Sequence, residues 1–209
     1  MTYPAPDPGN LGAYHRYICE VLQSDGTPSM VLISGDLHHE RRIAVAQLVD
    51  WVEAGVCGIV DCRGEYSDES LVAHEFPQLT YIYVGVDDDG GTQSDEWFDA
   101  GVDAALEIIN RSERVMVHCH MGINRGPSMA FAILLARGMG VSEALTAILN
   151  ARPIVGIIYA ESAIEWFGRR NDWTLDQVAD AQAELAAWRE QHGINRDHVV
   201  RMIRSVASQ

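Results

Sequence analysis

A cysteine stands between two histidines in the stretch VMVHCHMGINRGPSMA, which covers residues 115–130. A cysteine attacks an electrophile as a thiolate, and an unperturbed cysteine is mostly protonated at neutral pH. The stretch is typical of a strand, a tight loop and the start of a helix. Backbone N–H groups that converge at a helix N-terminus favour a thiolate, so we expect a lowered pKa for the Cys119 thiol.

Two further residues of this loop indicate what such a thiolate would attack. Gly122 lets the chain curl where a side chain would obstruct it. Successive backbone amides that point inward form a nest for an oxyanion. Arg125 adds a planar guanidinium that can bind two oxygens of one phosphate, a geometry that lysine lacks. The spacing therefore predicts an anion-binding loop with a nucleophile at its base.

Other interpretations of the cysteine explain less. If Cys119 were only a buried structural thiol, the presence of Gly122 and Arg125 at this spacing would have no explanation. Zinc bound by His118, Cys119 and His120 is disfavoured, because neighbours in an extended chain point to opposite faces and no second ligand pair has a useful spacing. The histidines of DLHHE, residues 36–40, are more typical of a solvated turn than of a metal site. We expect neither a metal nor a cofactor.

Short apolar segments that alternate with helical patterns must position the loop. Strands are expected at residues 29–34, 57–62, 80–86 and 114–118. Helices are expected at residues 42–55, 94–111, 126–140, 141–152 and 158–168. We expect Ser142 to cap the fourth helix and Gly168 to end the fifth. This order predicts an α/β fold with a mostly parallel central sheet of four to five strands flanked by helices, and ligands bind beyond the strands' carboxyl ends.

Residues 169–209 differ from the rest of the chain and predict a C-terminal helical extension. A narrow apolar stripe is formed by Leu175, Val178, Ala181, Leu185 and Trp188. Gly193 interrupts it, and residues 195–209 predict a last helix with three arginines and one aspartate. A helical hairpin packed on the chain's own acidic surface is expected, and a homodimer contact is the alternative.

Composition excludes several classes of protein. The formal net charge of -15 argues against nucleic acid as a partner, because phosphate backbones are bound by lysine and arginine. The chain has neither an apolar segment of the length that a membrane helix needs nor a signal-peptide pattern. Four cysteines in a chain of 209 residues do not indicate a disulfide framework. We expect a cytoplasmic protein without membrane or nucleic-acid partners.

The pattern His118-Cys119-(five residues)-Arg125 resembles the signature of the protein tyrosine phosphatase superfamily, and its surroundings are similar to the dual-specificity branch. LISGDL is similar to the opening strand of that branch, AGVCGIVDCRGEY to its next helix-to-strand passage, and ALTAILNARP to its late helix. The resemblance implies a catalytic domain at residues 28–168, between an N-terminal segment at 1–27 and the extension at 169–209. It also implies metal-independent hydrolysis of phosphate monoesters through a phosphocysteine.

The resemblance also implies roles for the residues of the loop. Cys119 would be the nucleophile, and His118 would support the loop and the thiolate through hydrogen bonding. The phosphate would be bound by Arg125 and the backbone amides of the loop: His120, Met121, Gly122, Ile123, Asn124 and Arg125.

A general acid must protonate the leaving oxygen. In the resembling family the acid lies on the loop after the third strand, where VDDDGG offers Asp87, Asp88 and Asp89. Alignment of YVGVDD with the family pattern favours Asp88, and the other two stay open. Three adjacent carboxylates should raise one another's pKa, which would help one of them stay protonated.

The chain departs from the family pattern after the arginine. The family usually has a serine or threonine there, whose hydroxyl helps the thiolate leave when water attacks the phosphocysteine, and this chain has Gly126. A slow second step is one expectation, and a catalytically weak relative that binds phosphoproteins is the alternative. Cys62 ends a strand expected beside that of Cys119, and in some relatives such a cysteine forms a reversible disulfide with the nucleophile. A buried apolar thiol is its other interpretation.

Substrate class follows from the loop composition. Relatives that act on inositol phosphates tend to carry lysines between the cysteine and the arginine, and this chain has none there. No segment resembles the phosphotyrosine-recognition loop of the larger tyrosine phosphatases. We expect a phosphorylated protein, or another phosphomonoester, as the partner, with phosphotyrosine and/or phosphoserine/threonine as the group hydrolysed.

Overall fold

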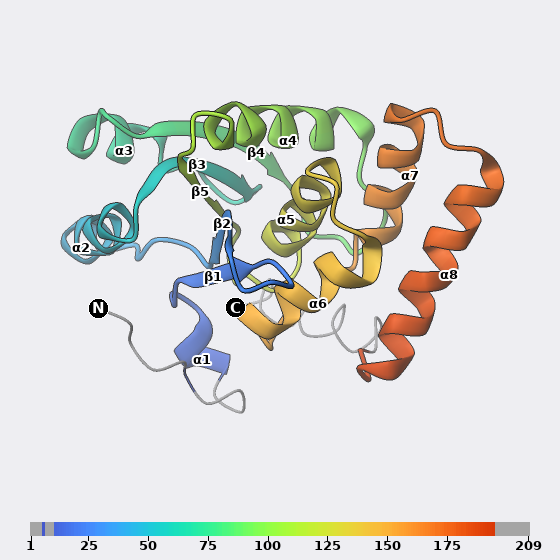
Figure 1. Cartoon of the computed structure of the whole chain (residues 1–209). Coiled ribbons are helices and arrows are strands. Elements are labelled where there is room, and N and C mark those ends of the chain that lie inside the picture. The colour runs from blue at the N-terminus through green and yellow to red at the C-terminus, as the bar shows by residue number, and fades with distance from the viewer. Residues whose placement is uncertain (1–5, 7–10, 195–209) are drawn as a thin grey trace.

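A five-stranded sheet forms the centre of the computed structural model, which describes residue 6 and residues 11–194 (Figure 1). The strands are β1 (Cys19–Leu22), β2 (Pro28–Ser34), β3 (Val56–Arg63), β4 (Thr80–Val86) and β5 (Arg114–His118). Their order across the sheet is β1-β2-β5-β3-β4. Only β1 runs antiparallel, against β2, and the other pairs are parallel. The α/β fold with a mostly parallel sheet is therefore confirmed.

Helices cover both faces of the sheet (Figure 1). The helices are α1 (Leu11–Tyr14), α2 (Arg41–Glu53), α3 (Glu69–Glu75), α4 (Asp95–Ile109), α5 (Arg125–Ala136), α6 (Val141–Ala151), α7 (Ala160–Arg170) and α8 (Leu175–Gln191). Val115 and Val117 of β5 face the large cluster under α4 to α8, and Met116 between them faces the small cluster under α2 and α3. This alternation buries both faces of β5, as expected for a central parallel strand.

Two helix boundaries differ from the sequence-based expectation. The helix expected to be capped by Ser142 begins at Val141, and Gly140 is its N-cap. The Ser142 amide instead donates to Glu184 of α8 at 2.8 Å. Helix α7 does not end at Gly168 but continues to Arg170, because its last two arginines form ion pairs with acidic residues of α4.

Three short elements were not expected: α1, β1 and α3. Each has four to seven residues, too few for a clear helical or alternating pattern. Strand β1 adds an antiparallel edge to the sheet from within residues 1–27. The division of the chain into three parts stays a prediction.

Helix α8 packs against α6 and α7 (Figure 1). Ala181, Leu185 and Trp188 of the predicted stripe are buried, so this part of the stripe is covered without a homodimer. Leu175 is 88% exposed at the start of the helix and does not belong to the buried face. The last helix expected at 195–209 lies outside the described residues. Within the described part of the chain, no helix has the length and apolar character needed to span a membrane.

Candidate active site

The loop between β5 and α5 has the tight turn that its glycine predicts. Gly122 has a φ of 63°, which favours glycine, and a Cβ there would lie 2.6 Å from Nη2 of Arg152 and 2.7 Å from the Ser34 carbonyl oxygen. Arg152 itself is buried and donates to the carbonyl oxygens of Gly122 at 2.6 Å and Met121 at 2.9 Å. The backbone N–H groups of Gly122 and Gly126, by contrast, interact with Cys119.

Cys119 is 1% exposed at the base of this loop. Burial raises the pKa of its thiol, while Arg125 and the backbone N–H groups of Gly126 and Gly122 lower it. The net direction is upward, so the expectation of a lowered pKa is wrong. Desolvation of the sulfur outweighs the loop amides and the helix N-terminus.

Arg125 is held by a carboxylate that the sequence reasoning missed. Its Nη1 and Nη2 donate to Glu65 at 2.8 and 2.7 Å, and Nη1 also donates to the Val86 carbonyl at 2.8 Å. The buried Nε has no hydrogen-bond partner among the described residues. Glu65 comes shortly after β3, the neighbour of β5, so the convergence of parallel strands at their carboxyl ends was the available signal. The contact of Arg125 Nε with an acidic group is an ion pair of 3.4 Å with Asp88.

The loop after β4 places one of its three aspartates at the site. Asp87 and Asp89 are exposed, whereas one Asp88 oxygen, Oδ2, lies 3.4 Å from Nε of Arg125. The other, Oδ1, accepts from Asn124 Nδ2 at 2.7 Å and from the Tyr159 hydroxyl at 2.8 Å.

Burial raises the pKa of Asp88, while Arg125, Asn124 and Tyr159 lower it. The pKa of Asp88 is raised, as expected, but burial is the main cause and Glu65 is the carboxylate that raises it further. Adjacent carboxylates along the chain therefore do not explain this shift.

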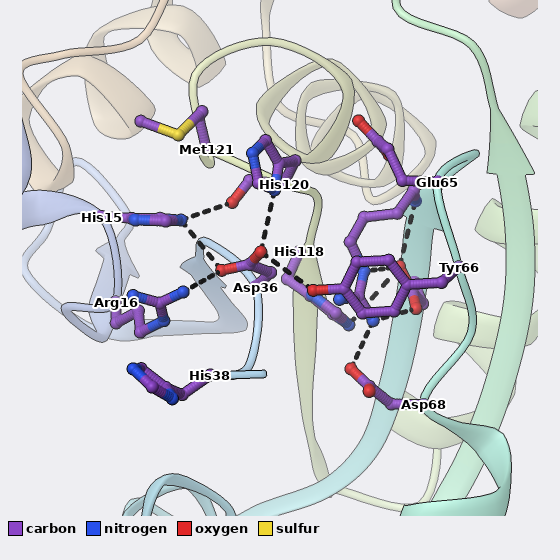
Figure 2. A network of polar contacts seen from close by, with 12 residues as sticks. His15, Arg16, Asp36, His38, Glu65, Tyr66, Asp68, His118, His120 and Met121 are labelled. Atoms are coloured by element: carbon purple, nitrogen blue, oxygen red, sulfur yellow. Dashed lines mark hydrogen bonds and ion pairs between the residues drawn. The ribbon is translucent and has the colours of Figure 1, made fainter. Parts of the chain in front are cut away.

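Asp36 connects the loop to the N-terminal segment (Figure 2). His120 Nδ1 and His15 Nε2 lie 2.8 and 2.9 Å from its carboxylate, and Arg16 and Tyr66 donate to it at 2.9 and 3.1 Å. Burial alone would raise the pKa of Asp36, but the hydrogen bonds from His120 and His15 hold it well below its usual range. The pKa of His120 is raised in turn by Asp36.

Three residues of this network are of the types that bind metal ions. The ligand atoms of His15, Asp36 and His120 all lie within 4.8 Å of one another. However, the carboxylate already accepts hydrogen bonds on both oxygens, one of them from the cationic Arg16. The group fits a hydrogen-bonding network better than a cation site. Asp36 belongs to the DLHHE stretch, but its partners are not the histidines of that stretch, and His38 points away from the network in Figure 2.

His118 is buried beneath the loop. Burial lowers the pKa of its ring to about 4, so the side chain is neutral near pH 7. Neither ring nitrogen has a hydrogen-bond partner in the described part of the chain, and the ring packs edge-on against Trp51 with 5.3 Å between centroids. The expected hydrogen bond is therefore not observed, and loop support by His118 stays a prediction.

The remaining loop residues are arranged as follows. Met121 is half-buried, Ile123 is buried and its carbonyl accepts from the Gly156 amide at 2.8 Å. A Cβ on Gly126 would lie 3.1 Å from the His118 carbonyl carbon and 3.2 Å from the Cys119 nitrogen. The first turn of α5 thus packs closely against the end of β5, which gives a steric reason for glycine where the family usually has a hydroxyl.

Cys62 lies beside Cys119 in the structure. The register of β3 and β5 pairs Asp61 with His118, which brings the next residues, Cys62 and Cys119, side by side. Both thiols are free and buried, and burial together with the charge of Cys119 raises the pKa of Cys62.

The family described as dual specificity phosphatase, catalytic domain, matches residues 55–163, just over half of the chain. The chain belongs to the dual-specificity phosphatase family. Its members are cysteine-based phosphatases of the protein tyrosine phosphatase type, and the resemblance stated from the sequence is confirmed. A comparison with curated protein sequences finds no match.

Solved structures agree with the dual-specificity phosphatase fold. Human DUSP28 superposes with a TM-score of 0.59 at 16% identity, covering 81% of this chain and 99% of that one. A mouse putative dual specificity phosphatase, complexed with zinc tungstate, has a TM-score of 0.59 at 17% identity and covers 81% and 92%. PTPMT1 has a TM-score of 0.57 at 20% identity and covers 80% and 99%. At these identities the likeness shows the fold alone.

Proposed function

We propose that this dual-specificity phosphatase hydrolyses phosphotyrosine and/or phosphoserine/threonine monoesters through a phosphocysteine on Cys119, with Asp88 as general acid. The observation that carries the proposal is the meeting of three groups at one loop. The buried Cys119 thiol, the Arg125 guanidinium and the Asp88 carboxyl group interact electrostatically with one another, and Nε of Arg125 makes no hydrogen bond to the described residues.

In the first proposed step, the Cys119 sulfur attacks the phosphorus while the bond to the leaving oxygen breaks. Asp88 gives its proton to that oxygen. Burial of Asp88 supports this role, because it favours the protonated carboxyl group that the step requires. The phosphate oxygens would be bound by Nε of Arg125 and the loop amides.

In the second proposed step, water attacks the phosphorus of the phosphocysteine and the sulfur leaves as a thiolate. Asp88, now ionised, accepts the proton from the water. Gly126 supplies no hydroxyl to the departing sulfur, so the backbone N–H groups of Gly122 and Gly126 are what stabilise it. Neither step uses a metal ion.

The proposed substrate is a phosphorylated protein rather than a compact polyphosphate. The loop carries no lysine, and Glu65 and Asp68 add negative charge near Arg125 and Arg63. We also propose that Cys62 can form a disulfide with Cys119 under oxidation, which would block the nucleophile reversibly.

Replacing Asp88 tests the proposed function. Asp88→Asn should lower kcat/KM, which reports formation of the phosphocysteine, about tenfold or more on phenyl phosphate, a poor leaving group, and change it little on para-nitrophenyl phosphate. Asp89→Asn is the matched control, because Asp89 is an exposed neighbour in the same loop, and it should leave both rates near those of the parent. Equal rates for parent and Asp88→Asn on both substrates would place the acid elsewhere. A parent that hydrolyses neither substrate would favour the phosphoprotein-binding alternative.

A further inference from the structure

We propose that Asn124 and Tyr159 are positioning residues that clamp one oxygen of Asp88 and leave the other to carry the catalytic proton. The proposal rests on the role proposed for Asp88. Neither residue was assigned such a role from the sequence: Asn124 was expected to contribute only its backbone amide, and Tyr159 lies 35 residues further along the chain.

Both clamp bonds reach the same carboxylate oxygen. Asn124 Nδ2 and the Tyr159 hydroxyl donate to Asp88 Oδ1 at 2.7 and 2.8 Å. Oδ2 instead lies 3.4 Å from Nε of Arg125. An oxygen that already accepts two hydrogen bonds is a poor place for a proton that must itself be donated. The proton of neutral Asp88 therefore resides on Oδ2, the oxygen that faces the phosphate-binding arginine.

The orientation of the Asn124 amide is fixed by its other end. Its Oδ1 accepts from the backbone N–H of Ile158 at 2.7 Å and from the Ser128 hydroxyl at 3.3 Å. Because the oxygen is committed to these two donors, the amide nitrogen is the group that faces Asp88. A flip of the amide would lose all three hydrogen bonds.

The orientation of the Tyr159 hydroxyl is also fixed by its contacts. Its ring is fully buried, and its hydroxyl also accepts from the Gly90 amide at 3.2 Å, so the hydroxyl proton points to Asp88. Gly90 belongs to the same loop as Asp88, and Tyr159 thus holds both the acid and the turn that follows it. The Tyr159 amide donates in turn to the Ser128 hydroxyl at 3.3 Å.

The turn that carries Tyr159 shows the backbone strain often found at functional sites. Ile157 has a φ of 45°, an unusual conformation for a β-branched residue. Such a conformation persists only where the surroundings over-determine it. The Asn124 bond to Ile158, and a bond of 3.0 Å from Arg189 of α8 to the Ile157 carbonyl, are contacts that do so.

The hydrogen bonds from Asn124 and Tyr159 also affect the pKa of Asp88. The charged and titratable groups that face Asp88 are Arg125, Glu65, Cys119 and Tyr159. Donors to the carboxylate stabilise its ionised form, so loss of one of them raises the pKa of Asp88 further. A general acid works while it is protonated, and its pKa sets the alkaline limb of the rate profile. Loss of the clamp should therefore move that limb to higher pH.

Tyr159→Phe tests the clamp, because it keeps the buried ring and removes the hydroxyl. We expect kcat/KM on phenyl phosphate to fall about fivefold, kcat/KM on para-nitrophenyl phosphate to change little, and the alkaline limb of kcat/KM to move up by roughly one pH unit. Asn124→Asp keeps an acceptor for Ile158 and replaces the donor by a second carboxylate, so it should shift the limb in the same direction. In an Asp88→Asn background, Tyr159→Phe should cause no further loss on phenyl phosphate.

Thr146→Val is the matched control, because it also removes a hydrogen bond of 2.9 Å, from Trp188 between α6 and α8. It should lower stability without changing the leaving-group dependence or the pH profile. An equal loss on both substrates in Tyr159→Phe, an unmoved limb, or an additive loss in the Asp88→Asn background would overturn the clamp. If Asp88→Asn itself spared both substrates, the failure would belong to the assignment of the acid and not to the clamp.

Discussion

Single residues of the site are held by partners that are distant in the sequence. Arg125 is held by Glu65, His120 by Asp36, and the loop carbonyls by Arg152. Nε of Arg125 and Oδ2 of Asp88 lie 3.4 Å apart, and we propose that a phosphate ester binds between these two groups. A site whose side chains are fixed before the substrate arrives loses little entropy on binding it.

Local spacing could predict only part of this arrangement. The turn at Gly122 and the nearness of Arg125 and Asp88 to Cys119 follow from a seven-residue loop and from the converging ends of strands. Glu65 and Arg152 were not predicted as partners of the loop, because their own segments contain no motif that indicates such a role. The raised pKa of Cys119 was missed for a different reason, since burial of the sulfur depends on the packing of the whole fold.

The glycine at position 126 leads to a prediction about the time course. Because no hydroxyl assists the departing sulfur, breakdown of the phosphocysteine should be slower than its formation. Rapid mixing with para-nitrophenyl phosphate should then show a burst of about one product per enzyme, followed by slower turnover. A time course that is linear from the first turnover would contradict this expectation.

At the scale of elements, the carboxyl ends of four parallel strands assemble the site. Asp36 follows β2, Glu65 follows β3, Asp88 follows β4 and Cys119 follows β5. The alternation of strands and helices was readable from the sequence, because these strands have five to eight residues and are rich in apolar side chains. Strand β1 was not readable, since four residues before a turn carry too weak a pattern.

The pairing of β3 with β5 leads to a prediction about oxidation. Treatment with peroxide should oxidise Cys119 and Cys62 to a disulfide while the peroxide is reduced to water. Mass spectrometry should find a peptide that links these two cysteines, together with loss of activity that a thiol reductant restores. Cys57→Ser is the control, because Cys57 lies on the same strand and should not affect the link. Cys119 oxidised without any linked peptide would exclude the disulfide.

At the scale of the whole molecule, the C-terminal helix α8 stabilises a turn beside the proposed site. Helix α8 packs on α6 and α7, and its Arg189 donates to the Ile157 carbonyl and pairs with Glu161. It therefore contacts the turn that carries Tyr159. The sequence predicted an extension that packs on the chain itself, but its contact with the turn near the acid required the structure.

Packing of α8 predicts a difference between two leucines of one helix. Leu185 is 1% exposed and Leu175 is 88% exposed. Leu185→Ala should reduce the free energy of unfolding by about 2–5 kcal/mol, because it leaves a cavity in the core. Leu175→Ala should change it by less than about 0.5 kcal/mol. Denaturant titration of both variants measures the difference, and equal effects would show that α8 does not pack as described.

We propose above all that Cys119 is the nucleophile of a metal-independent phosphatase. The most direct measurement is hydrolysis of para-nitrophenyl phosphate in the presence of a metal chelator, by the parent and by Cys119→Ser. We predict that the parent stays active with the chelator and that Cys119→Ser loses activity on the order of a thousandfold or more. Activity that the chelator abolishes, or that survives in Cys119→Ser, would contradict the account.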